Sequence, residues 1–202
     1  MEEMGEGAER MPNEDYAIVL DYLPQGKSSG YKSEPLAQVM GTAFFTLLEV
    51  IPKSALAMQE QVYVGREERE KITQIKCRIM YRDLTSTAVA ELERAVEVVV
   101  EGNTQRFLDF FNKSTAITIK RHQLELLPGL GKKHMIMVLE ERHKKPFESF
   151  DEISQRIPAF SNPKSAVVKR IIEEIRGEAD KHYLFARPPA PPREHFGFHK
   201  RR

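Results

Sequence analysis

A short turn holds the residues of this chain that are best suited to chemistry, and that chemistry is the binding of an anion. Gly129, Leu130 and Gly131 lead directly into Lys132 and Lys133, where we expect an apolar helix to begin. The first turn of a helix has backbone N–H groups without partners, and the helix dipole places partial positive charge beside them. With two lysines next to these groups, the turn is predicted to bind a phosphate group. Nothing in it suits bond breaking.

Further basic and hydroxyl-bearing residues lie near this turn or near a second helix start downstream. Residues 157–160 repeat the pattern of residues 127–130, but Ala159 and Ser161 replace the two glycines of the first copy. We therefore expect the first copy to bind phosphate and the second to be mostly structural. The additional candidate contacts for nucleic acid are His134, Lys120, Arg121, Lys144, Lys145, Lys164, Ser165 and Lys169.

No set of residues in the sequence indicates catalysis. There is neither a P-loop nor a Ser-His-Asp signature, and the carboxylates Asp83, Glu91 and Glu93 are typical of a strand end and a solvated helix face. Cys77 is the only cysteine, which excludes an internal disulfide and a zinc site made of several cysteines. Its apolar neighbours predict a buried, inert thiol. We expect a protein that is not an enzyme and that uses no metal and no cofactor.

Charge is distributed unevenly along the 202 residues, although the whole chain carries a net charge of only +1. From residue 112 onward there are 19 Lys and Arg against 11 Asp and Glu, a net charge of +8. The preceding residues have 12 against 19, a net charge of −7. This asymmetry favours an anionic partner for the C-terminal part. Mutual attraction between the two halves is the alternative explanation.

The turn must be positioned by the elements on either side of it. Pro128 and Gly129 are expected to end a helix over residues 115–127, because proline lacks the N–H of a continuing helical turn and glycine accepts a left-handed exit. Leu130 is expected to be buried between that helix and the one that begins at Lys132. Two further helices are predicted over residues 147–157 and 164–176.

The order Leu-Pro-Gly-Leu-Gly-Lys over residues 127–132, followed by an apolar segment, resembles the helix–hairpin–helix family of nucleic-acid-binding motifs. In that family the backbone N–H groups of the turn bind the sugar–phosphate backbone without reading bases. The resemblance assigns this role to Gly129, Leu130, Gly131, Lys132 and Lys133. With the second copy it implies a tandem helix–hairpin–helix domain over residues 112–177. The alternatives are a plain turn between packed helices and a dimerisation or scaffold element.

The N-terminal half is predicted to be a small β-domain. Four segments are rich in β-branched and aromatic residues or alternate apolar with charged residues, namely residues 16–23, 39–51, 61–65 and 72–84. Gly41 inside the second segment predicts a bulge or a bend. With helices over residues 86–101 and 104–111, these strands favour an OB-like β-barrel plus connecting helices over residues 14–111, and so an α+β protein. The candidate contacts to single-stranded nucleic acid are Lys27, Tyr31, Lys32, Phe44, Phe45, Tyr63, Arg66, Arg78 and Tyr81, with core packing as the alternative for the aromatic side chains.

Both ends of the chain lack the periodicity of folded elements. Residues 1–13 are acidic and contain glycine, which predicts a disordered lead. Residues 178–202 form a Pro-rich basic tail, predicted to be extended and either solvated or a contributor to nucleic-acid binding. The sequence shows no secretory signal and no membrane span, so we expect a cytoplasmic protein without membrane contact.

The run from Tyr16 in YAIVLDYLP to Lys132 in LPGLGK resembles an uncharacterised archaeal family of unknown function that is described as RNA-binding. The resemblance spans residues 14–177 and implies an OB-like N-terminal part and a helix–hairpin–helix C-terminal part, without an established ligand. We therefore expect a non-catalytic nucleic-acid-binding protein, with RNA favoured over DNA. The alternatives are a DNA-binding accessory protein of repair or recombination, and a module that binds protein partners in a ribonucleoprotein or repair assembly.

Overall fold

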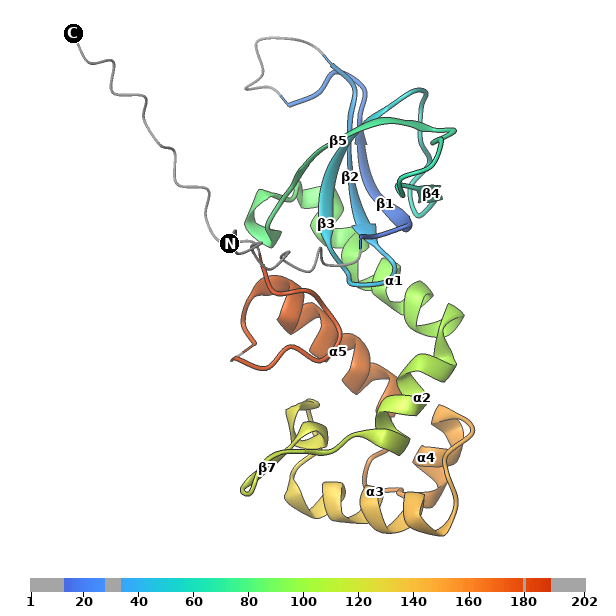
Figure 1. Ribbon diagram of the computed structural model, residues 1–202, viewed down its shortest axis with the longest axis vertical. Coiled ribbons are helices and arrows are strands. Elements are labelled where there is room, and N and C mark those ends of the chain that lie inside the picture. The colour runs from blue at the N-terminus through green and yellow to red at the C-terminus, as the bar shows by residue number, and fades with distance from the viewer. Residues whose placement is uncertain (1–12, 28–33, 180, 190–202) are drawn as a thin grey trace, which may run out of the picture.

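A curled antiparallel β-sheet forms one end of the molecule, and a group of helices forms the other (Figure 1). The structure, a computed structural model, describes residues 13–27, 34–179 and 181–189. Within these residues the sheet has five strands in the order β4-β1-β2-β3-β5. Their bounds are β1 (Tyr16–Leu23), β2 (Leu36–Gly41), β3 (Leu47–Pro52), β4 (Gln61–Tyr63) and β5 (Ile72–Arg78). The predicted α+β class is confirmed.

Helices make up most of the chain after β5, and the first of them, α1, covers one face of the sheet. Their bounds are α1 (Ser86–Gly102), α2 (Thr104–Lys113), α3 (Lys132–Lys144), α4 (Phe150–Arg156) and α5 (Pro163–Arg176), with the short 3-10 helices η1 (Tyr81–Asp83) and η2 (Gln123–Leu126). A small β-hairpin of β6 (Ala116–Thr118) and β7 (Arg121–His122) lies between α2 and η2. The side chains of Thr85, Ser149 and Asn162 cap α1, α4 and α5 by accepting backbone N–H groups.

Both faces of the central strands β1, β2 and β3 are buried, one inside the curl of the sheet and the other against α1. The pairing of β1 with β2 shifts register between Val19 and Asp21, and such a bulge bends a strand. Successive side chains of β1 alternate between two cores. Ala17 and Val19 pack in an inner core on the concave side of the sheet, whereas Ile18 and Leu20 pack with residues of α1 on the other side.

The single strand predicted over residues 39–51 is wrong, because the chain turns back between β2 and β3. The Glu14 carboxylate, 5 % exposed, organises this turn by accepting the N–H groups of Ala43, Phe44 and Thr46 at 2.9–3.2 Å. Gly41 makes room for this carboxylate, since a Cβ at that position would lie 2.0 Å from the Glu14 side chain. The glycine therefore marks the end of a strand and the start of a tight connection.

The helix predicted over residues 115–127 is also wrong, since β6, β7 and η2 take its place. The run Thr115, Ile117, Thr118 and Ile119 is β-branched, and such side chains lose freedom in a helix and suit an extended strand. The strand predicted over residues 72–84 ends early, with β5, before η1. The helices predicted over residues 86–101, 104–111, 147–157 and 164–176 correspond to α1, α2, α4 and α5.

A buried carboxylate in α5 fixes part of the C-terminal tail. Glu174 is 0 % exposed and accepts the N–H groups of Leu184, Phe185 and Ala186 at 2.7–2.9 Å. The Nε–H of Arg170, itself buried, donates to the same carboxylate at 2.9 Å. The paired and hydrogen-bonded charge is therefore satisfied inside the fold.

The segment held in this way packs between the helices and the sheet (Figure 1). Phe185 lies edge-on against Phe107 and Phe110 of α2, with ring centroids 5.4 and 5.0 Å apart. The expectation of a solvated tail is therefore wrong for residues 184–186, because a phenylalanine and three backbone donors find partners there. Residues 1–12 of the predicted lead and residues 190–202 of the tail lie outside the described residues.

We expect Glu174→Ala to destabilise the protein strongly, because three buried N–H groups and the Arg170 guanidinium lose their acceptor. Each buried group left unpaired costs about 1–3 kcal/mol, so the free energy of unfolding should fall by about 3 kcal/mol or more. Denaturant unfolding measures this change. The exposed Glu178→Ala is the control and should lower stability by less than about 0.5 kcal/mol. Equal stability of the two variants would contradict the role assigned to Glu174.

Candidate functional site

One buried side chain anchors the turn that precedes α3. Leu130 is 2 % exposed and packs in the core formed by the helices, and its N–H donates to the carbonyl oxygen of Leu127 at 3.0 Å. Gly129 has a φ of +80°, in the left-handed region that glycine adopts without a steric penalty. The predicted burial of Leu130 and the predicted glycine conformation are confirmed, and the turn is held in one orientation.

The start of α3 presents backbone donors to solvent. Gly131 is the N-cap residue and has no side chain that could accept an N–H group. The first hydrogen bond of the helix joins the Met135 N–H to the Gly131 oxygen at 2.9 Å. The N–H groups of Lys132, Lys133 and His134 precede this bond and have no acceptor among the described residues. Both lysine side chains are exposed beside them.

An open hollow of about 690 Å³, which we call the turn pocket, lies at this turn. Residues 125–134 and Glu173 of α5 line it. The His134 ring borders the pocket with its Nδ1 3.2 Å from the carbonyl oxygen of Gly129, a distance that fits an N–H on Nδ1. The carboxylates of Glu125 and Glu173 lie on its wall, so an anion is favoured on the side of the lysines and the open N–H groups.

The β-hairpin β6–β7 extends this region with more positive charge. A second hollow of about 400 Å³ is lined by Lys120 and Arg121 from the hairpin together with Lys132 of α3. Because Glu125 and Lys132 line both hollows, the two hollows are adjacent. We call the surface formed by Lys120, Arg121, Lys132, Lys133 and His134 the basic turn surface. It unites five of the residues predicted from the sequence, although two of them lie on a β-hairpin rather than on a helix.

Arg142 of α3 holds the hairpin in place, a role that the sequence did not reveal. Its guanidinium donates to the carbonyl oxygens of Phe111 and Ser114 and to the Ser114 hydroxyl at 2.9–3.1 Å. Since Ser114 comes just before β6, these bonds tie the base of the hairpin to α3. The partners are separated by 28 and 31 positions in the chain, so no local pattern reports the contact.

His122 links the hairpin to η2. Its ring Nδ1 accepts the backbone N–H of Leu124 at 3.1 Å, and the carboxylate of Glu125 accepts the backbone N–H of His122 at 2.9 Å. Burial, and then the charge of Arg142, lower the pKa of His122, against the opposing effect of Glu125. The imidazole is therefore held neutral, which leaves Nδ1 free to accept this hydrogen bond.

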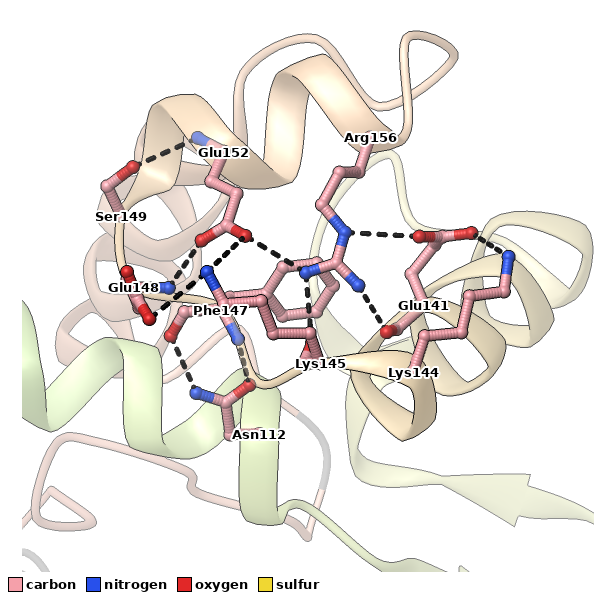
Figure 2. Close-up of polar contacts among 9 residues, drawn as sticks. All are labelled: Asn112, Glu141, Lys144, Lys145, Phe147, Glu148, Ser149, Glu152 and Arg156. Atoms are coloured by element: carbon pink, nitrogen blue, oxygen red, sulfur yellow. Dashed lines mark hydrogen bonds and ion pairs between the residues drawn. The ribbon is translucent and has the colours of Figure 1, made fainter.

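The predicted contacts Lys144 and Lys145 lie apart from the basic turn surface and are paired with carboxylates (Figure 2). Lys144 pairs with Glu141 at 2.6 Å, and Lys145 lies 3.1 Å from Glu148 and 3.8 Å from Glu152. At 1.5 Å per residue, Lys144 is about 18 Å along α3 from Lys132. Figure 2 also shows Arg156 reaching both Glu141 and Glu152, so this end of α3 is a network of ion pairs between helices.

The predicted residues in α5 do not line the turn pocket. Lys164 forms an ion pair with Glu101 of α1, and the Ser165 N–H donates to the Asn162 side chain at 3.0 Å. Lys169 is exposed in the middle of the helix. Because Glu173 borders the turn pocket, Lys164 lies about 14 Å away along the helix axis. Lys169 lies one turn of α5 before Glu173, about 6 Å along the axis, but it is not among the residues that line the turn pocket.

Most candidates in the β-domain have partners of their own. Lys27 forms an ion pair with Glu49, and the guanidiniums of Arg187 and Arg176 lie over the rings of Phe44 and Tyr81. The Tyr63 ring lies edge-on against Tyr16, and Phe45 is buried. Core or surface packing therefore accounts for these aromatic rings. Arg66 and Arg78 line a separate pocket, and Tyr31 and Lys32 lie outside the described residues.

The described part of the chain has neither a cluster of metal ligands nor a membrane-spanning helix. No group of three or more His, Cys, Asp or Glu side chains there is arranged to hold a metal ion. No helix among the same residues is long and apolar enough to cross a lipid bilayer.

Known proteins match this chain over most of its length. It is 42 % identical over 177 residues to the uncharacterized protein MJ0038 of Methanocaldococcus jannaschii, a match that covers 86 % of this chain and 80 % of that protein. The crystal structure of Af1531 from Archaeoglobus fulgidus, described as family model DUF655, is similar to this chain with a TM-score of 0.80 and 43 % sequence identity. The match covers 86 % of this chain and 100 % of that one. The model of a protein family of unknown function, DUF655, matches residues 13–187. The protein whose turn, hairpin and curled sheet are described above therefore belongs to the DUF655 family.

Proposed function

We propose that this protein binds nucleic acid, preferentially RNA, by holding backbone phosphates on the basic turn surface, and that it does so without catalysis. One observation carries the proposal: three N–H groups at the start of α3 lack acceptors among the described residues and lie beside two exposed lysines. A phosphate oxygen is an acceptor that suits such donors, and its charge is favoured by the helix dipole.

We further propose that the turn acts as a helix–hairpin–helix motif in which η2 replaces most of the first helix. The Pro-Gly-Leu-Gly-Lys order, the buried Leu130 and the positive φ of Gly129 support this interpretation. The helices α4 and α5, joined by residues 157–162, then form the second copy of a tandem domain. We also propose that the curled sheet is an OB-like barrel, which its five antiparallel strands support.

Phosphate contacts carry no base-specific information, so they do not separate RNA from DNA. The preference for RNA follows from the family resemblance, and a DNA-binding accessory role in repair or recombination is the nearest alternative. The alternative from another functional class is a module that binds protein partners in an assembly. Ile119 at the hairpin tip is fully exposed and Ile136 in α3 is half-exposed, and exposed apolar side chains favour a protein partner.

We expect the double variant Lys132→Ala/Lys133→Ala to bind RNA more weakly and with a smaller dependence on salt. Each lost phosphate contact should reduce the slope of log K against log salt by about 0.7 on a single strand, so the double variant should lose about 1.4. Fluorescence anisotropy across a salt series measures the slope for single-stranded RNA, duplex RNA, single-stranded DNA and duplex DNA.

The matched control for this experiment is Arg82→Ala/Arg94→Ala, which removes two exposed positive charges from η1 and α1. It should leave the slope within about 0.3 of the wild type. An equal reduction in both double variants would mean that net charge, rather than the basic turn surface, governs binding. An unchanged slope in Lys132→Ala/Lys133→Ala would remove the turn as the binding site.

We expect Gly131→Asp to raise stability while it weakens RNA binding. The new side chain can accept the open N–H groups as an N-cap, which should add about 0.5 kcal/mol to the free energy of unfolding. A Cβ at this position meets no heavy atom within 4 Å, so the fold accommodates it. The same carboxylate occupies the donors and repels phosphate, so Kd should rise at least about tenfold, equivalent to about 1.4 kcal/mol.

The control for this variant is Gly102→Asp, which adds the same side chain at an exposed position on α1 where a Cβ also meets nothing within 4 Å. It should leave RNA affinity within about twofold of the wild type. If Gly131→Asp is well folded and binds RNA as tightly as Gly102→Asp does, the N–H groups of α3 are not the phosphate site.

A further inference from the structure

A second concentration of positive charge lies in the β-domain, away from α3. Four arginines, Arg66, Arg69, Arg78 and Arg187, line a cavity of about 290 Å³ together with Glu14. We call this cavity the arginine pocket. Its arginines come from the connection after β4, from β5 and from the C-terminal segment, so the tail that Glu174 holds in place contributes one wall.

The hydrogen bonds made by Arg69 and Arg78 leave the charge of these two side chains in place. The Nε–H of Arg69 donates to the carbonyl oxygens of Val64 and Gly65 at 3.3 and 2.8 Å. Arg78 donates to the carbonyl oxygens of Arg187 and Pro188. Neutral carbonyl acceptors fix the orientation of a guanidinium without the compensation that a carboxylate would give.

Among the described residues, Glu14 is the carboxylate that lines the pocket, and it is already occupied. Glu14 accepts three backbone N–H groups of the turn between β2 and β3, as described above, and is 5 % exposed. With one Glu against four Arg, the lining carries a formal charge of +3. Burial and then the charge of Arg187 lower the pKa of Arg78, while Glu14 opposes this. An anion that reaches Arg78 would therefore stabilise the charged form of this guanidinium.

The rest of the lining suits an organic molecule. Leu48, Val64 and Ile75 belong to the inner core of the sheet or pack against it, and they give the pocket an apolar wall. Thr46 also lines the pocket, and its buried hydroxyl has no hydrogen-bond partner among the described residues. A buried hydroxyl without a partner is costly, so a polar ligand group that reaches it would be stabilised.

We propose that the arginine pocket binds a phosphate ester, with the phosphate on the arginines and the attached organic group against the apolar wall. Guanidinium groups bind phosphate oxygens through paired, charge-assisted hydrogen bonds, which favours phosphate at a site with several arginines. The volume is at the lower end of the range for ligand pockets, about 300–1,000 Å³, and suits a single phosphorylated unit. The phosphate belongs either to a free nucleotide or to the end of a strand, and this site does not depend on the basic turn surface.

Isothermal titration calorimetry of the full chain with adenosine monophosphate, adenosine and inorganic phosphate tests the proposal. Adenosine monophosphate should bind more tightly than inorganic phosphate, and adenosine should not bind. Arg66→Ala, at an exposed position on the rim, should weaken the binding of adenosine monophosphate at least about tenfold without a change in thermal unfolding. The neighbouring exposed Lys76→Ala should leave it unchanged.

Arg78→Gln provides a second variant, used after its fold is checked by circular dichroism, and should weaken binding at least as much as Arg66→Ala. No heat at millimolar adenosine monophosphate, or equal affinity in wild type and both arginine variants, overturns the proposal. Loss of the same binding in Lys132→Ala/Lys133→Ala also overturns it, because the nucleotide would then occupy the turn pocket. Failure at one site is thus distinguished from failure at the other.

Oligonucleotides of one sequence with and without a 5′-phosphate identify the source of the phosphate. Tighter binding of the phosphorylated strand, abolished by Arg66→Ala, assigns the pocket to a strand end. Equal binding of both strands, with adenosine monophosphate still bound and still sensitive to Arg66→Ala, assigns it to a free nucleotide. Either result supports a phosphate-ester site.

Discussion

Backbone N–H groups that no strand or helix can pair must find another acceptor, and this requirement organises three parts of the molecule. At the turn between β2 and β3 the acceptor is the buried carboxylate of Glu14, and along residues 184–186 it is that of Glu174. At the start of α3 the described residues supply none, because the N-cap is Gly131. The first two places are satisfied inside the fold, and the third is therefore where we expect a ligand to supply the acceptor.

Contacts between distant parts of the chain determine where positive charge lies on the molecule. Glu174 holds the C-terminal segment against α2 and α5, and the same segment then delivers Arg187 to the sheet, where its N–H donates to the Phe44 oxygen at 2.9 Å. Arg142 ties the β6–β7 hairpin to α3 and so places Lys120 beside Lys132. Positive surfaces thus arise at both ends of the molecule from side chains fixed by carbonyl and carboxylate contacts, and both suit phosphate groups.

Features that depend on neighbouring residues in the chain could be predicted from the sequence. The Pro-Gly-Leu-Gly-Lys order was sufficient to predict the turn, the burial of Leu130 and the start of α3. The helix expected before the turn is absent because the β-branched side chains among residues 115–119 favour an extended strand, although their hydrophobic spacing also fits a helix. The arginine pocket had no local signal, since Arg78 and Arg187 are 109 positions apart and meet only because the tail packs on the sheet. Lys144 and Lys145 each pair with a carboxylate three positions away, so the spacing in the sequence was sufficient to indicate these ion pairs. The contact of Arg156 with Glu141 instead depends on how α3 meets α4.

The backbone donors at the start of α3 can be observed directly by NMR. In a ¹⁵N-labelled sample titrated with a short single-stranded RNA, the amide resonances of Lys132, Lys133 and His134 should show the largest shifts, because a phosphate oxygen becomes their hydrogen-bond acceptor. The Gly129 and Leu130 amides should follow them. Large shifts confined to other parts of the chain, with residues 129–134 unmoved at saturation, would contradict the assignment of the α3 start as the phosphate site.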